Sequence, residues 1–233
     1  MFSRPHHQRI AHVLESLNPD LFKKHKCYFG GGTAIVLRFG EFRESHDIDF
    51  LVSDREGYRD LRQAASGAEG SSALIKPERA SFISAQQIKI DQYGIRTRLH
   101  VFDQLIKFEI VHEGRIELEK PAPKDQVCSV PTLTLLDLAA SKLLANSDRF
   151  ADDSVFSRDI IDLAMMSLPL KVLRRAVAKA ECAYGEAIKR DLEKSLIRLE
   201  ERTGWLEQCL KVLAMEQSKA EIWQKIRGLR RVL

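Results

Sequence analysis

Two short stretches decide the fold of this 233-residue chain: GGGTAIV at positions 30–36 and RESHDIDF at positions 43–50. The glycines follow a short apolar run and precede a helical pattern, so they predict a turn between a strand and a helix. Positions 47–50 alternate polar and apolar side chains, which predicts a strand with Asp47 and Asp49 on one face. We therefore expect a strand–turn–helix unit followed by an acidic strand.

The aspartate pair is the sharpest local feature. Two carboxylates about 7 Å apart on one strand face repel each other, and a cation or water relieves that repulsion. Oxygen ligands of this kind hold Mg²⁺ together with the phosphates of a substrate. The alternative is a solvent-exposed strand face that binds nothing. The pattern of Asp47 and Asp49 alone leaves both interpretations open.

The glycine turn offers a second binding element. Glycines let the backbone N–H groups approach a ligand closely, and a helix N-terminus favours an anion. The stretch matches neither GxxxxGK[ST] nor GxGxxG, which disfavours the two nucleotide-binding folds that carry those motifs. The alternative is a plain tight turn.

A third acidic residue follows on a later predicted strand. In positions 105–110, Ile106, Phe108 and Ile110 share one face, while Lys107 and Glu109 share the other. Glu109 would join the aspartate pair if both strands belonged to one sheet. The alternative is a Lys–Glu pair at the surface.

The order of predicted elements indicates an α/β (α+β) domain with a mixed sheet, followed by a C-terminal helical bundle. We expect a first domain over residues 1–120 and a helical domain over residues 125–233, separated by the stiff KPAPK stretch at 120–124. The expected helices include one from 5 to 21 and, in the second domain, four over these ranges: 132–145, 157–166, 170–202 and 205–233.

Composition narrows the class of protein. The chain has 37 basic and 33 acidic residues, is 44% hydrophobic, and contains no apolar stretch near the ~20 residues of a membrane span. Its N-terminus lacks the apolar block of a signal peptide. Four dispersed cysteines without a CxxC motif predict buried free thiols in a reduced, cytoplasmic protein. Residues 171–233 carry a surplus of six positive charges, which predicts either a nucleic-acid-facing tail or a solvated helix surface.

The adjacent residues His6 and His7 do not predict a metal site. Neighbouring residues of a helix point in different directions, so they do not converge on one ion. We expect a frayed N-terminus instead.

Taken together, the glycine turn, the acidic strand and the later acid resemble the nucleotidyltransferase superfamily of the DNA polymerase β type. The closer resemblance is to the AbiEii/AbiGii-type toxins. Positions 31–50 are similar to the GGTAL…RxSxDIDF signature of those toxins, and positions 142–163 are similar to their KLxA…R…RDxxDL segment. The resemblance covers roughly residues 28–166.

For the first motif, the resemblance implies that Asp47 and Asp49 hold Mg²⁺, as two ions, with Glu109 as a third carboxylate ligand. It also implies that Gly31 and Gly32 cradle a nucleoside triphosphate.

Further residues gain implied roles around that centre. Thr33 would lie near the triphosphate. Arg43 and Ser45 would contact phosphates or support the acidic strand, the alternative being a structural salt bridge of the loop.

In the second motif, the resemblance implies that Lys142 neutralises phosphate charge and that Asp159 is a functional carboxylate. The alternative for Lys142 is a surface lysine whose stem covers apolar surface. Asp162, on the same helix face as Asp159, has the alternative of a cap or a salt bridge.

The implied function is that of a metal-dependent nucleotidyltransferase, the toxin of a toxin–antitoxin pair. It would transfer a nucleotide from an NTP to RNA, tRNA included, or to a protein, and its partner would be a cognate antitoxin rather than a membrane. Two alternatives remain: a small-molecule transferase of the antibiotic-modifying kind, and an inactive binding module of the same fold.

Overall fold

The structure is a computed structural model that describes residues 2–67 and 70–233. The chain divides into two compact units. The first comprises Met1–Arg38 and Ser45–Thr134, and the second comprises Phe39–Glu44 and Leu135–Leu233. The KPAPK stretch that we took as the boundary thus lies inside the first unit, and the segment Phe39–Glu44 joins the helical one.

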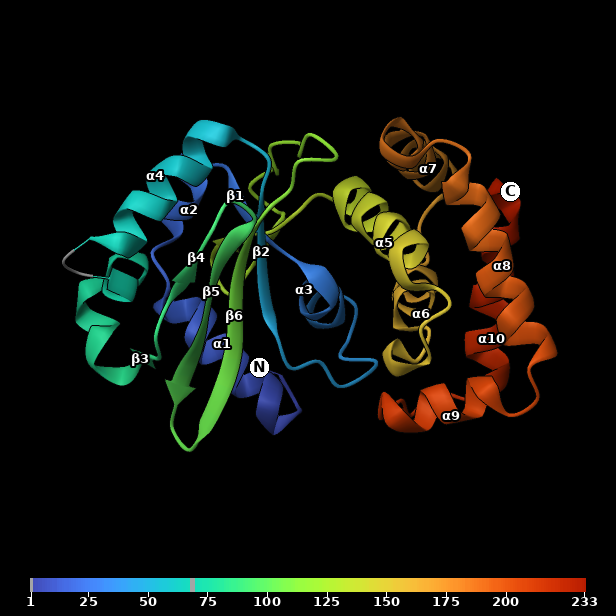
Figure 1. Cartoon of the computed structure of the whole chain (residues 1–233). Coiled ribbons are helices and arrows are strands. Elements are labelled where there is room, and N and C mark those ends of the chain that lie inside the picture. The colour runs from blue at the N-terminus through green and yellow to red at the C-terminus, as the bar shows by residue number, and fades with distance from the viewer. Residues whose placement is uncertain (1, 68–69) are drawn as a thin grey trace. The chain divides into compact units, whose positions relative to one another are not determined.

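The first unit is built on a mixed sheet, as the sequence predicts (Figure 1). The strand order is β1-β2-β6-β5-β3, and β4 also pairs with β5. Strand β2 lies antiparallel to β1 and parallel to β6, while β5 and β6 are antiparallel. The strands are β1 (Cys27–Gly30), β2 (Ile48–Val52), β3 (Ser84–Ala85), β4 (Lys89–Ile90), β5 (Gly94–Val101) and β6 (Gln104–His112). A separate small ribbon pairs β7 (Gln126–Val127) with β8 (Val130–Pro131).

The helices that accompany this sheet among the described residues are α1 (Pro5–Ser16), α2 (Pro19–Lys24), α3 (Gly31–Arg38) and α4 (Arg55–Ser66). Two 3-10 helices, Gly70–Leu74 and Pro77–Phe82, follow α4. In Figure 1, α2 and α4 lie on one side of the sheet and α3 lies on the other. The core between α2 and the sheet contains a group of aromatic rings with centroids 4.5–5.7 Å apart: Phe22, Phe29, Phe50 and Phe108.

The single helix that we predicted over residues 5–21 is two helices. Asn18 accepts a hydrogen bond from the Leu21 backbone N–H at 3.3 Å, and Pro19 occupies the first turn of α2. Both features start a new helix rather than continue the old one.

The second unit is helical, as expected. Its helices are α5 (Leu135–Arg149), α6 (Arg158–Met165), α7 (Leu170–Tyr184), α8 (Ala187–Glu201), α9 (Trp205–Val212) and α10 (Lys219–Arg227), with 3-10 helices at Asp153–Val155 and Gly228–Val232. The helix predicted over 170–202 is divided into α7 and α8, because Gly185 adopts φ +57° and ends α7.

The four cysteines are free, but they are not all buried. Cys27 and Cys209 are buried, Cys128 is half-buried and Cys182 is exposed. Within the residues that the structure describes, no helix has both the length and the apolar character needed to cross a membrane.

Candidate active site

The glycine turn meets the acidic strand at Gly31 and Asp49. Gly30 ends β1 and is the register partner of Asp49, and Gly31 begins α3 with φ +67°. A Cβ atom on Gly31 would lie 3.0 Å from the Asp49 Cβ and would overlap its Oδ2. Only glycine therefore permits both this backbone conformation and this approach. The N-terminal turn of α3 lies directly against the Asp49 carboxylate.

Asp49 and the later acid lie on neighbouring strands of one sheet. Asp49 on β2 is the register partner of Glu109 on β6, and the strands are parallel, so both side chains project from the same face. Ile48 and Phe50 are fully buried on the opposite face, as their alternation predicts. The expectation that Glu109 shares a sheet face with the aspartate is confirmed.

Glu109 also forms the surface pair that was its alternative. Lys107 Nζ lies 2.6 Å from Glu109 Oε2, and Arg96 Nε on β5 lies 3.3 Å from Glu109 Oε1. Partial burial by itself would lower the pKa of Lys107. The hydrogen bond to Glu109 and the charges of Glu109, Asp47 and Asp49 outweigh it and raise that pKa above its usual value. Lys107 therefore lies in the field of all three carboxylates.

Asp47 directly precedes β2 instead of opening it, because the strand starts at Ile48. Its carbonyl oxygen accepts a hydrogen bond from Thr33 Oγ1 at 2.5 Å, and Thr33 Oγ1 lies 2.8 Å from Ser45 Oγ. Thr33 and Ser45 are both buried. These two hydroxyls thus support the acidic segment through hydrogen bonds within the first unit.

The remaining predicted residues belong to the second unit. Arg43 forms a two-pronged ion pair with Asp162, with Nε–Oδ1 at 2.6 Å and Nη2–Oδ2 at 2.8 Å, and both side chains are buried. Asp162 also lies 2.7 Å from Lys142 Nζ. The salt bridge that was the alternative for both Arg43 and Asp162 is therefore present.

Lys142 connects this pair to a second buried carboxylate. Its Nζ lies 2.9 Å from Asp159 Oδ1, and Arg149 donates to both oxygens of Asp159 at 2.7 and 2.9 Å. The Lys142 side chain is only 7% exposed, so the surface-lysine alternative is wrong. Three cations and two carboxylates form one network, in which all but the half-buried Arg149 are buried. We call it the ionic cluster: Arg43, Lys142, Arg149, Asp159 and Asp162.

The ionic cluster keeps its carboxylates charged. Burial alone would raise the pKa of Asp159, but the Lys142 and Arg149 charges hold that pKa well below its usual range. Burial likewise opposes ionisation of Asp162, and the charges of Arg43 and Lys142 lower its pKa.

The fit of the first-unit carboxylates to Mg²⁺ can be judged from their chemistry. Asp47 and Asp49 supply the oxygen donors that Mg²⁺ prefers, and the ion commonly takes one or two carboxylates and completes its shell with substrate phosphates and water. Among residues 2–67 and 70–233, no three acidic, histidine or cysteine side chains are arranged to hold one ion. The residues thus fit a two-carboxylate site, with Glu109 engaged by Lys107 and Arg96.

Sequence reasoning misjudged His7, one of the histidines of α1. His7 is fully buried and accepts a hydrogen bond from the Ser45 backbone N–H, so the expectation of a frayed N-terminus is wrong. The spacing of His7 with Ile10 and Leu14, which share the buried face of α1, was the signal that could have placed it inside.

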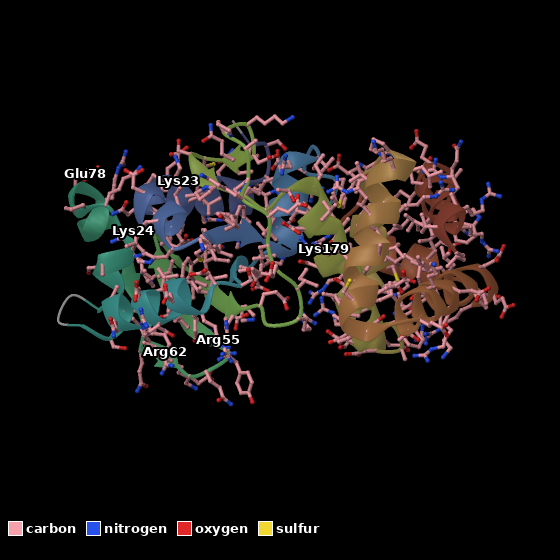
Figure 2. All side chains as sticks on the ribbon, turned by 90° about the horizontal axis from the view of Figure 1, so that it is seen from above. Lys23, Lys24, Arg55, Arg62, Glu78 and Lys179 are labelled. Carbon is pink, nitrogen blue, oxygen red and sulfur yellow. The ribbon has the colours of Figure 1, made fainter. Side chains whose placement is uncertain are left out.

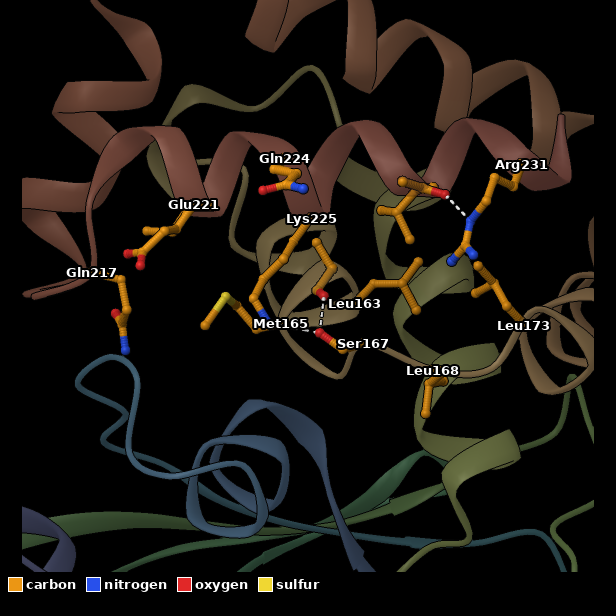
Figure 3. A pocket seen from close by; sticks show the side chains of 14 residues that line it. Leu163, Met165, Ser167, Leu168, Leu173, Gln217, Glu221, Gln224, Lys225 and Arg231 are labelled. Atoms are coloured by element: carbon orange, nitrogen blue, oxygen red, sulfur yellow. Dashed lines mark hydrogen bonds between the residues drawn. The ribbon is translucent and has the colours of Figure 1, made fainter.

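A cavity of about 650 Å³ lies in the second unit between α6 and α10 (Figure 3). Its wall combines apolar side chains with Lys225, whose Nζ donates to Ser167 Oγ at 2.7 Å. None of the predicted site residues lines this cavity.

The positive surplus of the C-terminal helices is partly neutralised. Lys179 on α7 pairs with buried Asp137 on α5, and ion pairs also engage Arg198 and Arg202 with Asp153. Exposed cations occur in the first unit as well, on α2 and α4, and Figure 2 labels four of them: Lys23, Lys24, Arg55 and Arg62. Positive surface charge is therefore not confined to the C-terminal tail.

The mixed sheet with its acidic strand after a glycine turn defines a protein of the nucleotidyltransferase fold. The chain shares this fold with a crystal structure from H. pylori described as a candidate nucleotidyltransferase, at a TM-score of 0.50 and 14% identity, covering 97% of this chain and 92% of that one. It is also similar to MenT4, a nucleotidyltransferase toxin from Mycobacterium tuberculosis H37Rv, at a TM-score of 0.47 and 15% identity, covering 96% and 92% of the two chains.

The chain belongs to the AbiEii family of nucleotidyltransferase toxins. The profile of that family, described as "Nucleotidyl transferase AbiEii toxin, Type IV TA system", matches residues 12–225. No curated protein matches the chain. The resemblance drawn from the two sequence motifs is thereby confirmed.

Proposed function

We propose that the chain is a metal-dependent nucleotidyltransferase that transfers a nucleotide from an NTP to an acceptor hydroxyl, with pyrophosphate as the leaving group. The observation that carries the proposal is the meeting of Gly31, Asp49 and Glu109 on one face of the sheet. A helix N-terminus that attracts anions lies there directly beside carboxylates that attract cations. A nucleoside triphosphate with its metal ions needs both.

In this proposal Asp47 and Asp49 hold the metal, as two Mg²⁺ ions, and the backbone N–H groups of Gly31 and Gly32 bind the triphosphate. Bound Mg²⁺ would stabilise negative charge on the reacting oxygens and activate the acceptor. Thr33 keeps the acidic segment against α3 through its hydrogen bond to the Asp47 carbonyl.

Glu109 is proposed as the third carboxylate. To take this role it must exchange the Lys107 ammonium, now 2.6 Å away, for a metal ion, while Arg96 remains beside its other oxygen. Because Lys107 is half exposed, its side chain can move into solvent when the metal binds.

In the second unit, we propose that Lys142 binds a phosphate and that Asp159 is its partner in the absence of that phosphate. Lys142 would exchange Asp159 for a phosphate, and Arg149 would continue to neutralise Asp159. The ionic cluster supports this exchange, because Arg149 would remain paired with Asp159 and Arg43 with Asp162 when Lys142 binds the phosphate.

The acceptor we propose is RNA, with the 3′ end of tRNA as the first candidate and a protein hydroxyl as the second. The surplus of six positive charges in residues 171–233 supports RNA, because phosphate binding draws on such charge. Membership of a Type IV toxin–antitoxin family supports a cognate antitoxin that counteracts the activity.

The test is transfer itself. The purified protein is incubated with each α-labelled NTP, Mg²⁺ and total RNA, or with a mixture of proteins or aminoglycosides, and the labelled product is identified. We expect label in RNA that disappears with EDTA. Label in a small molecule would contradict RNA as the acceptor and favour a small-molecule transferase. Nucleotide binding without any transfer would contradict the enzymatic activity and favour a binding module.

A further inference from the structure

Two adjacent histidines of α1 contact the loop that leads into β2. The Ser45 backbone N–H donates to His7 Nε2 at 3.2 Å, and His6 Nε2 lies 3.2 Å from the His46 carbonyl oxygen. The His6 and His46 rings meet edge-on, with centroids 4.5 Å apart. These contacts end one residue before Asp47.

The next residue of the loop is held by α3. Asp47 offers its carbonyl oxygen to Thr33 Oγ1 at 2.5 Å, and the same hydroxyl lies 2.8 Å from Ser45 Oγ. Three consecutive residues of the loop, 45–47, therefore each have a backbone group bonded to a side chain of α1 or α3. All of these residues belong to the first unit.

The hydrogen bonds require different protonation at the Nε2 atoms of the two histidines. A carbonyl oxygen only accepts, so His6 Nε2 carries a proton. A backbone amide only donates, so His7 Nε2 carries none and acts as the acceptor. Because His7 is 0% exposed, water cannot replace it as a partner for the buried Ser45 amide.

We propose that His7 is a positioning residue of the site, whose Nε2 holds the Ser45 amide and thereby sets the place of the Asp47 carboxylate two residues later. His6 and Thr33 hold the two carbonyls that follow. His7 itself touches no substrate. The proposal rests on the proposed function only in treating Asp47 as a metal ligand.

Hydrogen–deuterium exchange of the folded full chain tests the contact directly. His7→Leu fills the buried position with an apolar side chain and removes the acceptor, whereas the side-chain oxygen of His7→Gln can take the place of Nε2. We expect exchange of the Ser45 amide to be at least tenfold faster in His7→Leu and close to wild type in His7→Gln. The control is Ile10→Ala, which perturbs an equally buried position of α1.

Unchanged exchange in His7→Leu would contradict the proposal that the His7 contact protects the Ser45 amide. Equally fast exchange in Ile10→Ala would contradict it too, because a general loss of packing in α1 would then be the cause. This readout does not depend on any enzymatic activity. It therefore separates a failure of the positioning proposal from a failure of the proposed function.

Metal dependence then tests the consequence for the site. We expect the Mn²⁺ concentration for half-saturated binding to rise about tenfold in His7→Leu, because small displacements of a ligand are costly, and to recover in His7→Gln. A merely structural role would lower the folded fraction and leave the half-saturation point of the folded protein unchanged. Faster exchange with unchanged Mn²⁺ binding would show that His7 holds the loop, and it would contradict a role of that contact in positioning the Asp47 carboxylate.

Discussion

Asp49 on β2 and Glu109 on β6 are register partners on parallel neighbouring strands, and the next strand, β5, places Arg96 opposite Glu109. One face of the sheet thus presents carboxylates and cations in adjacent rows. Lys107 lies on the same face as Glu109 and forms an ion pair with it. The positive charge of Lys107 therefore lies next to the carboxylates at which we propose that metal ions bind.

Removing that lysine charge should strengthen metal binding. In Lys107→Met, Glu109 loses one cation, and we expect Mn²⁺ to bind about two- to fivefold more tightly, the scale of a half-exposed ion pair. Isothermal titration with Mn²⁺ measures it. Lys23→Met, which removes an exposed charge from α2, serves as the control. Weaker Mn²⁺ binding in Lys107→Met would mean that Lys107 supports the metal site instead of competing with it.

The contact between Gly31 and Asp49 predicts a specific sensitivity. Gly31→Ala adds a Cβ that overlaps the Asp49 carboxylate and strains a backbone with φ +67°. We expect a loss of stability of at least ~1 kcal/mol and a loss of Mn²⁺ binding. Gly185 also has a positive φ, of +57°, but an added Cβ there meets no atom within 4 Å, so Gly185→Ala is the control. If both variants lost Mn²⁺ binding equally, the clash with Asp49 would not be the reason.

Because Lys142 belongs to the ionic cluster, substituting it should lower the stability of the fold. Lys142→Ala removes a buried partner of two carboxylates, and we expect a loss of about 3 kcal/mol in the free energy of unfolding, measured by urea. The cost stays at the low end because Arg43 and Arg149 still pair with those carboxylates.

A double variant separates this structural cost from phosphate binding. Lys142→Met with Asp159→Asn removes one charge of each sign, so we expect it to recover part of the lost stability. If Lys142 also binds phosphate, as proposed, the double variant will still bind NTP at least tenfold more weakly than wild type. Wild-type NTP affinity in the double variant would leave Lys142 with the structural role alone.

The cluster also predicts an acid-sensitive stability. Cationic partners lower the pKa values of Asp159 and Asp162 in the folded chain, so the unfolded chain binds more protons at low pH. The stability that these two carboxylates contribute should therefore be fully present above about pH 4, and the free energy of unfolding should fall as the pH drops below that value.

Substitution checks the source of that slope. Asp162→Asn should cost about 3–5 kcal/mol at pH 7 and flatten the fall between pH 5 and 2. The control Glu201→Gln, at an exposed residue, should stay within about 0.5 kcal/mol of wild type. An unchanged slope in Asp162→Asn would place the acid sensitivity elsewhere.

Local sequence signals were enough for the glycine turn, the acidic strand and the alternation that buries Ile48 and Phe50, because each depends on neighbouring residues only. Whether β2 and β6 share a sheet was left open by the sequence, and their register, with Asp49 opposite Glu109, needs the folded sheet.

The ionic cluster lay beyond such reasoning. Arg43 and Asp162 are 119 positions apart, and a single sequence does not state which distant charges will pair. For the same reason His7 was misjudged: its partner, the Ser45 amide, is a backbone group that the sequence does not mark.

The most direct test of the proposed chemistry is transfer by Asp49→Asn, an almost isosteric change that removes one carboxylate charge beside Gly31. The variant is compared with wild type and with the exposed-site control Asp103→Asn, using the labelled NTP and acceptor that wild type uses. We predict a folded Asp49→Asn protein whose Mg²⁺-dependent transfer falls at least 100-fold, while Asp103→Asn keeps full activity. Full transfer by a folded Asp49→Asn protein would contradict the assignment of the site.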